Sequence, residues 1–417
     1  MELLRFATAG SVDDGKSTLI GRLLHDTKSL LDDTIEAVEI STARRGGTGL
    51  DLALITDGLR AEREQGITID VAYRYFATAT RSFVIADTPG HVQYTRNMVT
   101  GASNSELAII LVDARHGLKE QSFRHASIAS MLGIKQLVFA VNKMDLVDWS
   151  STRFHEIEVD VKNLATRLGL ADWVTIPMSA LSGDNVVDPS ENTPWYAGPT
   201  LLDHLEQVPT SLTKPTIGGR LSVQWIVRPT SDGDTTATGT DARRWYCGPH
   251  SGATFTVGDE VVILPSGTRS QITAVVGNGA ATRVQLADER DVSRGDLIAH
   301  AGHEPIVTNE FTAMICAMAD EPLVAGSRVL VKNGTRTTQA RILSIDARVD
   351  IVTGTEDTDA SSLALNDIGR ARFATAQPLT IDDYRSNRST GAFIAMHPLT
   401  NATLLAGMIM LPGYIAD

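Results

Sequence analysis

The residues from Gly10 to Ser17 form a pattern that is typical of a loop holding the phosphates of a nucleotide. The stretch reads G-S-V-D-D-G-K-S and fits G-x-x-x-x-G-K-[ST]. In this pattern the glycines let backbone N–H groups approach phosphate oxygens, Lys16 sets its charge on the β- and γ-phosphates, and the Ser17 hydroxyl binds Mg²⁺. The residues expected at the phosphates are Gly10, Asp13, Asp14, Gly15, Lys16, Ser17 and Thr18.

The segments on either side of this loop are a predicted strand and a predicted helix. An apolar run over residues 3–9 is typical of a buried parallel strand, and four apolar residues recur at helical spacing over residues 19–24. The loop therefore sits at the N-terminus of a helix. There the helix dipole and the unpaired N–H groups favour a phosphate.

A second strand is predicted to bring its end to the same phosphates. The apolar run over residues 83–86 leads into the sequence D-T-P-G-H. Asp87, at the carboxyl end of a parallel strand, can reach the Mg²⁺ shell, and Gly90 lets a backbone N–H approach the γ-phosphate. His91 follows directly, and we expect it to orient the water that attacks the γ-phosphorus.

A switch loop is predicted in the polar segment from Asp57 to Asp70. Taken alone, this segment favours an exposed loop before an edge strand. Between the two phosphate motifs, its Thr68 hydroxyl is expected to meet Mg²⁺ when the loop becomes ordered. The predicted catalytic residues are thus Lys16, Thr68 and His91, and the predicted metal-site residues are Ser17, Thr68 and Asp87.

Three more strand ends predict recognition of guanine. The apolar strand 107–112 closes with Asp113, the strand 137–141 runs into N-K-M-D, and the strand 174–178 ends in S-A-L. A carboxylate at Asp145 accepts the two donors that guanine presents and adenine lacks, and a site built on such pairs rejects the wrong base strongly. Asn142 is expected to serve the base and tie down the phosphate loop, and Lys143 to lay its aliphatic stem on the base. The S-A-L residues, Ser179, Ala180 and Leu181, are expected to meet the guanine oxygen.

Composition indicates a globular protein with more than one domain. The chain has 417 residues, with 42% hydrophobic and 21% charged residues, and two cysteines without metal-type spacing. There is no apolar run of 18 residues and no signal-peptide layout, which predicts a cytoplasmic protein without a membrane partner. The formal net charge of −13 makes nucleic acid an unlikely partner.

The remaining sequence predicts two β-barrels after an α/β domain. Residues 28–45 are predicted to form a helical insertion, and a Pro-, Ser- and Gly-rich linker places a boundary near residue 213. Short strands bounded by Gly, Pro and Asp follow to the end of the sequence. The predicted domains are 1–213 (P-loop GTPase), 214–305 (β-barrel) and 306–417 (β-barrel).

The motifs, in this order, resemble those of the translation-factor GTPases, the class that includes elongation factor Tu. Longer strings, such as DGLRAEREQGITIDVAYRYF and DTPGHVQYTRNMVTGAS, are similar to the large GTP-binding subunit of bacterial ATP sulfurylase (sulfate adenylyltransferase). Asp14 supports this, because elongation factors typically have histidine there and the sulfurylase subunit has aspartate. The segment 231–250 departs from the family pattern, whereas residues 384–393 resemble the ending of the sulfurylase subunit.

This resemblance implies GTP and Mg²⁺ as cofactors and a small catalytic subunit as partner, in a heterodimer or a larger assembly. It implies that this chain hydrolyses GTP and that the small subunit forms adenylylsulfate and pyrophosphate from ATP and sulfate. Two alternatives use the same first domain. One is a translation-type GTPase that delivers RNA, and the other is a regulatory switch without coupled chemistry.

Overall fold

The computed structural model describes residues 2–30, 32–44, 51–55, 71–90, 95–209, 217–228, 243–277 and 279–412. The chain forms two compact units. The first comprises Met1–Leu212 with Ile351–Gly354, and the second comprises Thr213–Asp350 with Thr355–Asp417. Among the described residues, no helix combines the length and the apolar character needed to cross a membrane. The domain limits 1–213, 214–305 and 306–417 stay a prediction.

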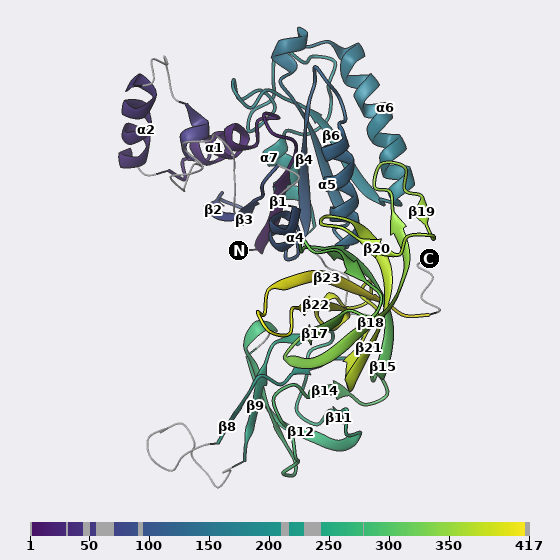
Figure 1. Ribbon diagram of the computed structural model, residues 1–417. Coiled ribbons are helices and arrows are strands. Elements are labelled where there is room, and N and C mark those ends of the chain that lie inside the picture. Colours follow the sequence, from purple (N-terminus) through teal and green to yellow (C-terminus); the bar gives the residue numbers. More distant parts are fainter. Residues whose placement is uncertain are drawn as a thin grey trace. The chain divides into compact units, whose positions relative to one another are not determined.

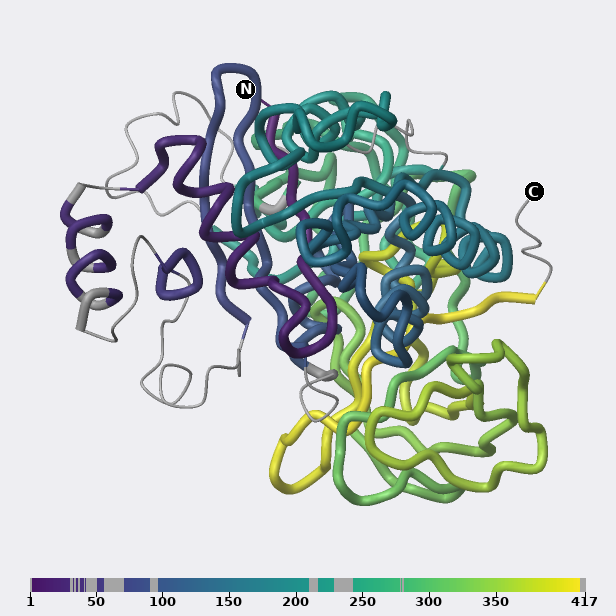
Figure 2. Tube along the Cα trace, turned by 90° about the horizontal axis from the view of Figure 1, so that it is seen from above, coloured from purple at the N-terminus to yellow at the C-terminus, as the bar shows by residue number. Residues whose placement is uncertain are grey.

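The first unit is built on a six-stranded sheet in the order β2-β3-β1-β4-β5-β6 (Figure 1). Its strands are β1 (Glu2–Ala9), β2 (Ala72–Ala77), β3 (Arg81–Asp87), β4 (Leu107–Asp113), β5 (Gln136–Asn142) and β6 (Asp172–Pro177). Only β2 runs antiparallel to its neighbour, and its hairpin with β3 lies in blue beside the purple β1 in Figure 2. Every residue of β4 is buried, as expected for a parallel strand covered on both faces.

Helices cover both faces of this sheet. They are α1 (Lys16–Asp26), α2 (Asp32–Arg44), α4 (Thr95–Ala102), α5 (Glu120–Met131), α6 (Ser151–Leu168) and α7 (Leu201–Gln207). The apolar stripes of α1 and α7 share one core cluster with Phe6, Phe83 and Ile109 of the sheet. Helices α4, α5 and α6 pack beside one another and against β1, β4 and β5 (Figure 1). The predicted strands at 3–9, 83–86, 107–112 and 137–141 and the helical insertion are confirmed.

The carboxyl ends of the parallel strands meet at one edge of the sheet. The register pairs Thr8 of β1 with Asp87 of β3, and Asp113 of β4 with Asn142 of β5. In open α/β sheets, ligands bind outside this edge. The segments that follow these strands therefore share one rim.

The second unit begins with an eight-stranded antiparallel sheet that closes into a barrel. Its order is β10-β7-β14-β11-β12-β13-β9-β8. Gln224, just after β7, closes it by donating its N–H to the Cys247 carbonyl of β9 at 2.9 Å. The strands are β7 (Arg220–Ser222), β8 (Trp225–Val227), β9 (Trp245–Gly248), β10 (His250–Ser251), β11 (Glu260–Leu264), β12 (Thr268–Val276), β13 (Thr282–Leu286) and β14 (Leu297–His300).

A seven-stranded antiparallel sheet follows in the order β17-β22-β23-β15-β21-β18-β19, and pairing of β17 with β18 closes it. Phe311, Phe373 and Phe393 pack together inside this second barrel. The strands are β15 (Ile306–Ala317), β17 (Arg328–Asn333), β18 (Arg336–Val349), β19 (Glu356–Asp357), β21 (Ile368–Ile381), β22 (Ala392–Met396) and β23 (Thr403–Met410), with the pair β16 (Leu323–Val324) and β20 (Ser362–Leu363) beside them and the short helix α8 (Arg388–Gly391) before β22.

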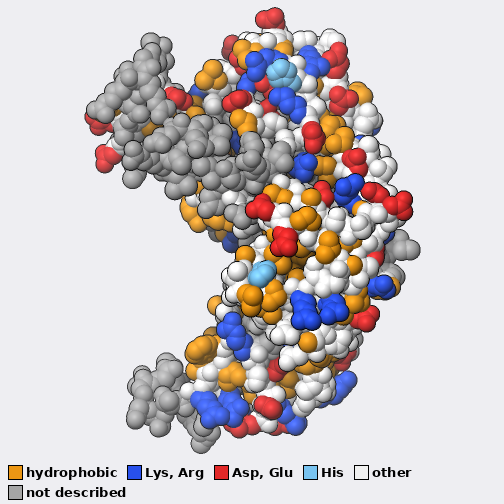
Figure 3. Space-filling model, viewed as in Figure 1, with side chains coloured by type: hydrophobic (Ala, Val, Ile, Leu, Met, Phe, Trp, Pro, Cys, Tyr) orange, Lys and Arg blue, Asp and Glu red, His pale blue; other side chains and the backbone are white. Residues whose placement is uncertain are grey.

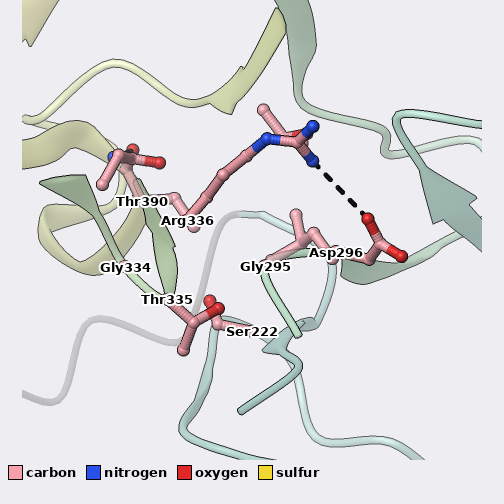
Figure 4. A pocket seen from close by; sticks show the side chains of 10 residues that line it. Ser222, Gly295, Asp296, Gly334, Thr335, Arg336 and Thr390 are labelled. Carbon is pink, nitrogen blue, oxygen red and sulfur yellow. Dashed lines mark hydrogen bonds and ion pairs between the residues drawn. The ribbon is translucent and has the colours of Figure 1, made fainter. Parts of the chain in front are cut away.

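A buried ion pair joins the two barrels within the second unit. Arg220 of β7 donates from Nε and Nη2 to the carboxylate of Asp382, at 3.0 and 3.1 Å, and Thr390 Oγ1 donates to the same carboxylate at 2.6 Å. The residues after β21 that resemble the sulfurylase ending therefore form part of the joint between the barrels. A second contact, from Arg336 to Asp296 at 3.5 Å, lies beside a pocket of about 20 Å³, room for roughly one water (Figure 4).

Candidate functional site: a phosphate loop beside a base-recognition rim

The phosphate loop runs from the end of β1 to the start of α1. Gly15 directly precedes the helix with φ of 96°, a conformation that L side chains rarely adopt. A Cβ at this position would lie 2.4 Å from Nδ2 of Asn142. Glycine is therefore required both by the backbone turn and by the close approach of Asn142, at the end of β5.

Lys16 lies buried within the curve of this loop. Its Nζ donates to the carbonyls of Gly10 at 3.0 Å and Ser11 at 3.1 Å. Burial lowers the pKa of Lys16, and the nearby charge of Asp87 opposes that shift. A desolvated ammonium at the start of a helix is well placed to stabilise phosphate charge. Ser17 and Thr18 continue the first turn of α1.

The segment after β3 packs directly on the phosphate loop. A Cβ at Gly90 would lie 2.4 Å from the Gly10 carbonyl oxygen and 2.4 Å from Lys16 Nζ. Thr88 Oγ1 donates to the Thr8 carbonyl at 2.7 Å, and Asp87 is buried at the end of β3. The structure thus brings Asp87 and Gly90 to the loop. The predicted residues Thr68 and His91 lie outside the described residues.

Asn142 connects the phosphate loop to the last strand end. Its Nδ2 donates to the Asp14 carbonyl at 2.8 Å, and its Oδ1 accepts the Ala180 N–H at 2.9 Å. Asn142 is 2% exposed, so both bonds lie inside the protein. The expected tie from Asn142 to the phosphate loop is present, and the same side chain also bonds to the segment after β6.

Lys143, which follows β5, and Asp113, at the end of β4, interact with each other at the carboxyl edge of the sheet. Lys143 has a left-handed backbone with φ of 63°, and its Nζ donates to the Asp13 carbonyl and lies 3.0 Å from Asp113 Oδ2. Burial by itself raises the pKa of Asp113, but hydrogen bonds from Arg115 and Lys143 outweigh it and hold that pKa well below its usual range. Asp113 is therefore a fixed negative charge that orients the lysine.

Asp145 and the S-A-L residues complete the rim. Asp145 lies in the short 3-10 helix Met144–Val147, whose first N–H bonds to the Met178 carbonyl at 3.2 Å. Ser179 is fully buried and donates its N–H to the Asp184 carbonyl at 3.2 Å, whereas Leu181 is 69% exposed. The segments that follow β5 and β6 are thus held to each other by a backbone bond.

The side chain of Asp14 bonds back to the backbone of the phosphate loop. Its Oδ2 accepts the Ser11 N–H at 2.7 Å, and Lys119 Nζ lies 3.8 Å from Oδ1. Burial raises the pKa of Asp14, and the hydrogen bond from Ser11 acts in the opposite direction. Its side chain therefore shapes the phosphate loop and connects it to the residue that precedes α5.

Arg22 and Lys119 also hold this site, and His125 is buried close enough to Lys16 to feel its charge, although none of the three stands in a recognised motif. Arg22 of α1 donates from Nε to the Ala180 carbonyl at 3.2 Å and from Nη2 to the Leu181 carbonyl. Arg22 and Asp26 have the i,i+4 spacing of an ordinary ion pair on a helix surface, and this spacing alone does not indicate a contact with Ala180. Lys119 belongs to none of the sequence motifs, so its contact with Asp14 could not be predicted. His125 of α5 is 2% exposed, its Nδ1 has no hydrogen-bond partner among the described residues, and burial lowers its pKa to about 3.

Comparisons with known proteins agree with this arrangement. The family model described as elongation factor Tu GTP binding domain matches residues 1–211, and the model described as GTP-eEF1A C-terminal domain-like matches residues 310–410. The expected architecture of a P-loop GTPase domain followed by antiparallel barrels is therefore confirmed.

Close relatives match nearly the whole chain. The bifunctional enzyme CysN/CysC of Mycobacterium tuberculosis (strain CDC 1551 / Oshkosh) is 52% identical, covering 98% of this chain and 67% of that protein. Sulfate adenylyltransferase subunit 1 of Saccharophagus degradans is 48% identical, covering 98% of this chain and 87% of that protein. A solved structure of sup35 complexed with GDP covers 98% of this chain and 94% of that chain at 20% identity, but its TM-score of 0.42 is too low to support an argument.

Proposed function

Because the chain belongs to the sulfate adenylyltransferase subunit 1 family, with a GTP-binding domain of the elongation factor Tu type, we propose that it is the GTPase subunit of an ATP sulfurylase. In this proposal, GTP hydrolysis drives formation of adenylylsulfate and pyrophosphate from ATP and sulfate. A separate small subunit carries out that second reaction. The two chains form a heterodimer or a larger assembly in the cytoplasm.

The observation that carries the GTPase part is the Asn142 bridge between the phosphate loop and the base-recognition rim. Added Cβ atoms at Gly15 and Gly90 would collide with Asn142 and with Lys16, so the packing of this loop requires glycine at both positions, as the phosphate-loop pattern does at Gly15. Lys16 supplies a buried cation at a helix N-terminus, where anions are favoured. Guanine selection is assigned to the Asp145 carboxylate, with Lys143 held against the base by Asp113.

The donor set also fits Mg²⁺, which prefers oxygen ligands and substrate phosphates over a protein cage. Ser17, next to Lys16 in the chain, offers a hydroxyl, and Asp87, close enough to act on the charge of Lys16, offers a buried carboxylate; Thr68 is proposed to complete the set. When bound, the ion neutralises charge that develops on the phosphates. Gly90 is proposed to contact the γ-phosphate through its N–H, and His91 to hold the attacking water in line.

The test measures GTP hydrolysis by the purified chain alone and with the small subunit, each with and without ATP and sulfate. We expect hydrolysis to rise only when the small subunit and both of its substrates are present, because a coupled reaction consumes them together. A Lys16→Ala variant is the control for contaminating GTPases, since it removes the buried cation from the phosphate loop.

A rate that does not respond to the small subunit, ATP or sulfate would contradict the sulfurylase assignment. Retention of charged tRNA by the GTP-bound chain would support the translation-type alternative instead. The two outcomes are distinct, because the second requires binding without any change in sulfate activation.

A further inference from the structure

The outer face of the barrel formed by β15 to β23 carries a cluster of cations that the fold does not need. Arg328 of β17 stands directly opposite Arg341 of β18 in the antiparallel register. Arg372 of β21 lies across from Ser344 of β18, and Lys332 lies further along the same face of β17. We call Arg328, Lys332, Arg341 and Arg372 the cationic face.

All four side chains point away from the core. They alternate with Val329, Val331, Ala340, Ile342 and Phe373, which are buried in the barrel interior. Each of the four is exposed, and none of these side chains makes a hydrogen bond or an ion pair among the residues that the structure describes. Figure 3 shows Lys and Arg side chains next to one another on this part of the second unit.

Three other arginines of the same barrel are paired. Arg370 lies 2.9 Å from Glu356, Arg348 lies 3.0 Å from Asp357, and Arg336 lies 3.5 Å from Asp296. Like charges placed directly opposite each other on an antiparallel pair destabilise a sheet. The Arg328–Arg341 pair therefore weakens the free barrel, and stability does not account for it.

The surroundings of the cationic face fit a protein partner. Leu330 pairs with Met396 on β22, and Leu343 is 37% exposed on β18, so aliphatic side chains lie between the charges. The exposed Glu310 of β15 is separated from Arg341 by Ala374 of β21. Arginine among aliphatic side chains is typical of protein interfaces, where it pairs with carboxylates in a bidentate way.

Nucleic acid fits this surface less well. The three phenylalanines of the barrel are buried, so among the described residues of its strands no aromatic ring is offered for base stacking. The chain as a whole carries a formal net charge of −13, which repels a polyanion and leaves only this local field to attract one.

We propose that the cationic face docks a carboxylate-bearing surface of the small catalytic subunit, an inference that rests on the proposed function. Opposite charge favours binding of a carboxylate-rich surface over other surfaces of the partner. Contact with those carboxylates would offset the repulsion between Arg328 and Arg341 that is present in the free chain.

The experiment uses the full-length chain with Arg341→Glu, and Arg294→Glu as the matched control. Arg294 is another exposed arginine whose side chain has no partner among the described residues, but it lies in the other barrel, between β13 and β14, and not on a strand of the cationic face. Affinity for the purified small subunit is measured at two salt concentrations, together with the thermal midpoint of the free chain and its basal GTP hydrolysis.

Arg341→Glu is expected to weaken the complex at least about tenfold and to flatten its salt dependence. The same variant is expected to raise the thermal midpoint of the free chain, because the introduced carboxylate would face Arg328, and to leave basal hydrolysis unchanged. Arg294→Glu is expected to change affinity less than about twofold.

Equal affinity losses for the two variants, or no loss for Arg341→Glu, would overturn the docking proposal while leaving the proposed function in place. A lowered midpoint for Arg341→Glu would show that the arginine is structural and would overturn it as well. Loss of binding to a single-stranded RNA probe, with the small subunit unaffected, would reassign the face to nucleic acid. If the unaltered chain does not bind the small subunit at all, it is the proposed function that fails.

Discussion

Replacing Asn142 by alanine is expected to loosen the phosphate loop without any change to a residue of that loop. The substitution removes the acceptor of the Ala180 N–H and the donor to the Asp14 carbonyl. Both groups lie beside a side chain that is 2% exposed, so they are left unpaired inside the protein. The phosphate loop and the S-A-L segment then lose their common support.

The magnitude follows from those two groups. A buried donor or acceptor that loses its partner costs about 1–3 kcal/mol. Two such groups give about 2–4 kcal/mol, after allowance for partial relaxation of the loop. Because about 1.4 kcal/mol changes an equilibrium constant tenfold, the equilibrium constant for local opening of the loop is expected to rise roughly 30- to 700-fold.

Native-state hydrogen exchange measures this opening directly. Peptides that cover residues 10–19 report the loop, where the Leu19 N–H bonds to the Gly15 carbonyl at 2.9 Å. The matched control is Asn185→Ala, because Asn185 is also buried, donates to the Pro177 carbonyl at 2.8 Å and accepts the Ser190 N–H at 2.8 Å. The control variant is expected to accelerate exchange around residues 177–193 only.

Unchanged exchange over residues 10–19 in Asn142→Ala would refute the reasoning, because the loop would then hold its shape without the bridge. An equal acceleration in both variants would refute it in another way, since the effect would be general destabilisation of the unit. Affinity for GDP is expected to fall in Asn142→Ala and to stay within about twofold in Asn185→Ala.

Three further outcomes follow from the site. Asp145→Asn is expected to shift preference from guanosine to xanthosine nucleotides, measured by competition binding, and unchanged GTP affinity would exclude Asp145 from base recognition. Gly90→Ala is expected to reduce nucleotide affinity at least about tenfold, because its Cβ would lie 2.4 Å from both Gly10 O and Lys16 Nζ; an unaffected dissociation constant would show that the segment shifts without cost. The pKa of His125 is lowered from 6.5 to about 3 by burial, so the unfolded chain binds a proton that the folded chain does not. Stability is therefore expected to fall by about 1.4 kcal/mol per unit as pH drops from 6.5 towards 3, and His125→Gln is expected to remove this slope in denaturation curves.

Strand ends were the most predictable part of the molecule. Buried parallel strands are continuous apolar runs, and the polar residues that follow them must meet at the carboxyl edge of the sheet. That rule alone places Lys16, Asp87, Asn142 and Ala180 in one region, and the structure has them there. The short strands of the two barrels were predictable for a similar reason, since Gly, Pro and Asp bound each one.

Contacts between distant segments were not predictable from the pattern. Trp245 and Tyr246 lie on β9, which pairs with β8 on one side and β13 on the other, and Tyr246 packs into the barrel core. Arg22 has the spacing of a surface helix residue, yet it holds the Ala180 carbonyl 158 positions away. The spacing of apolar residues predicts which face of a helix or strand is buried, but it does not predict which distant residue that face contacts.

The Arg220–Asp382 ion pair makes the joint between the two barrels dependent on both of its partners. Removing one partner of a buried pair leaves the other charge uncompensated inside the protein, at a cost of about 3–5 kcal/mol. Because Thr390 donates to the same carboxylate, β7 of one barrel and the segment after β21 of the other share a single buried anion. A substitution at Asp382 would therefore leave a buried guanidinium in one barrel and a hydroxyl without its acceptor in the other.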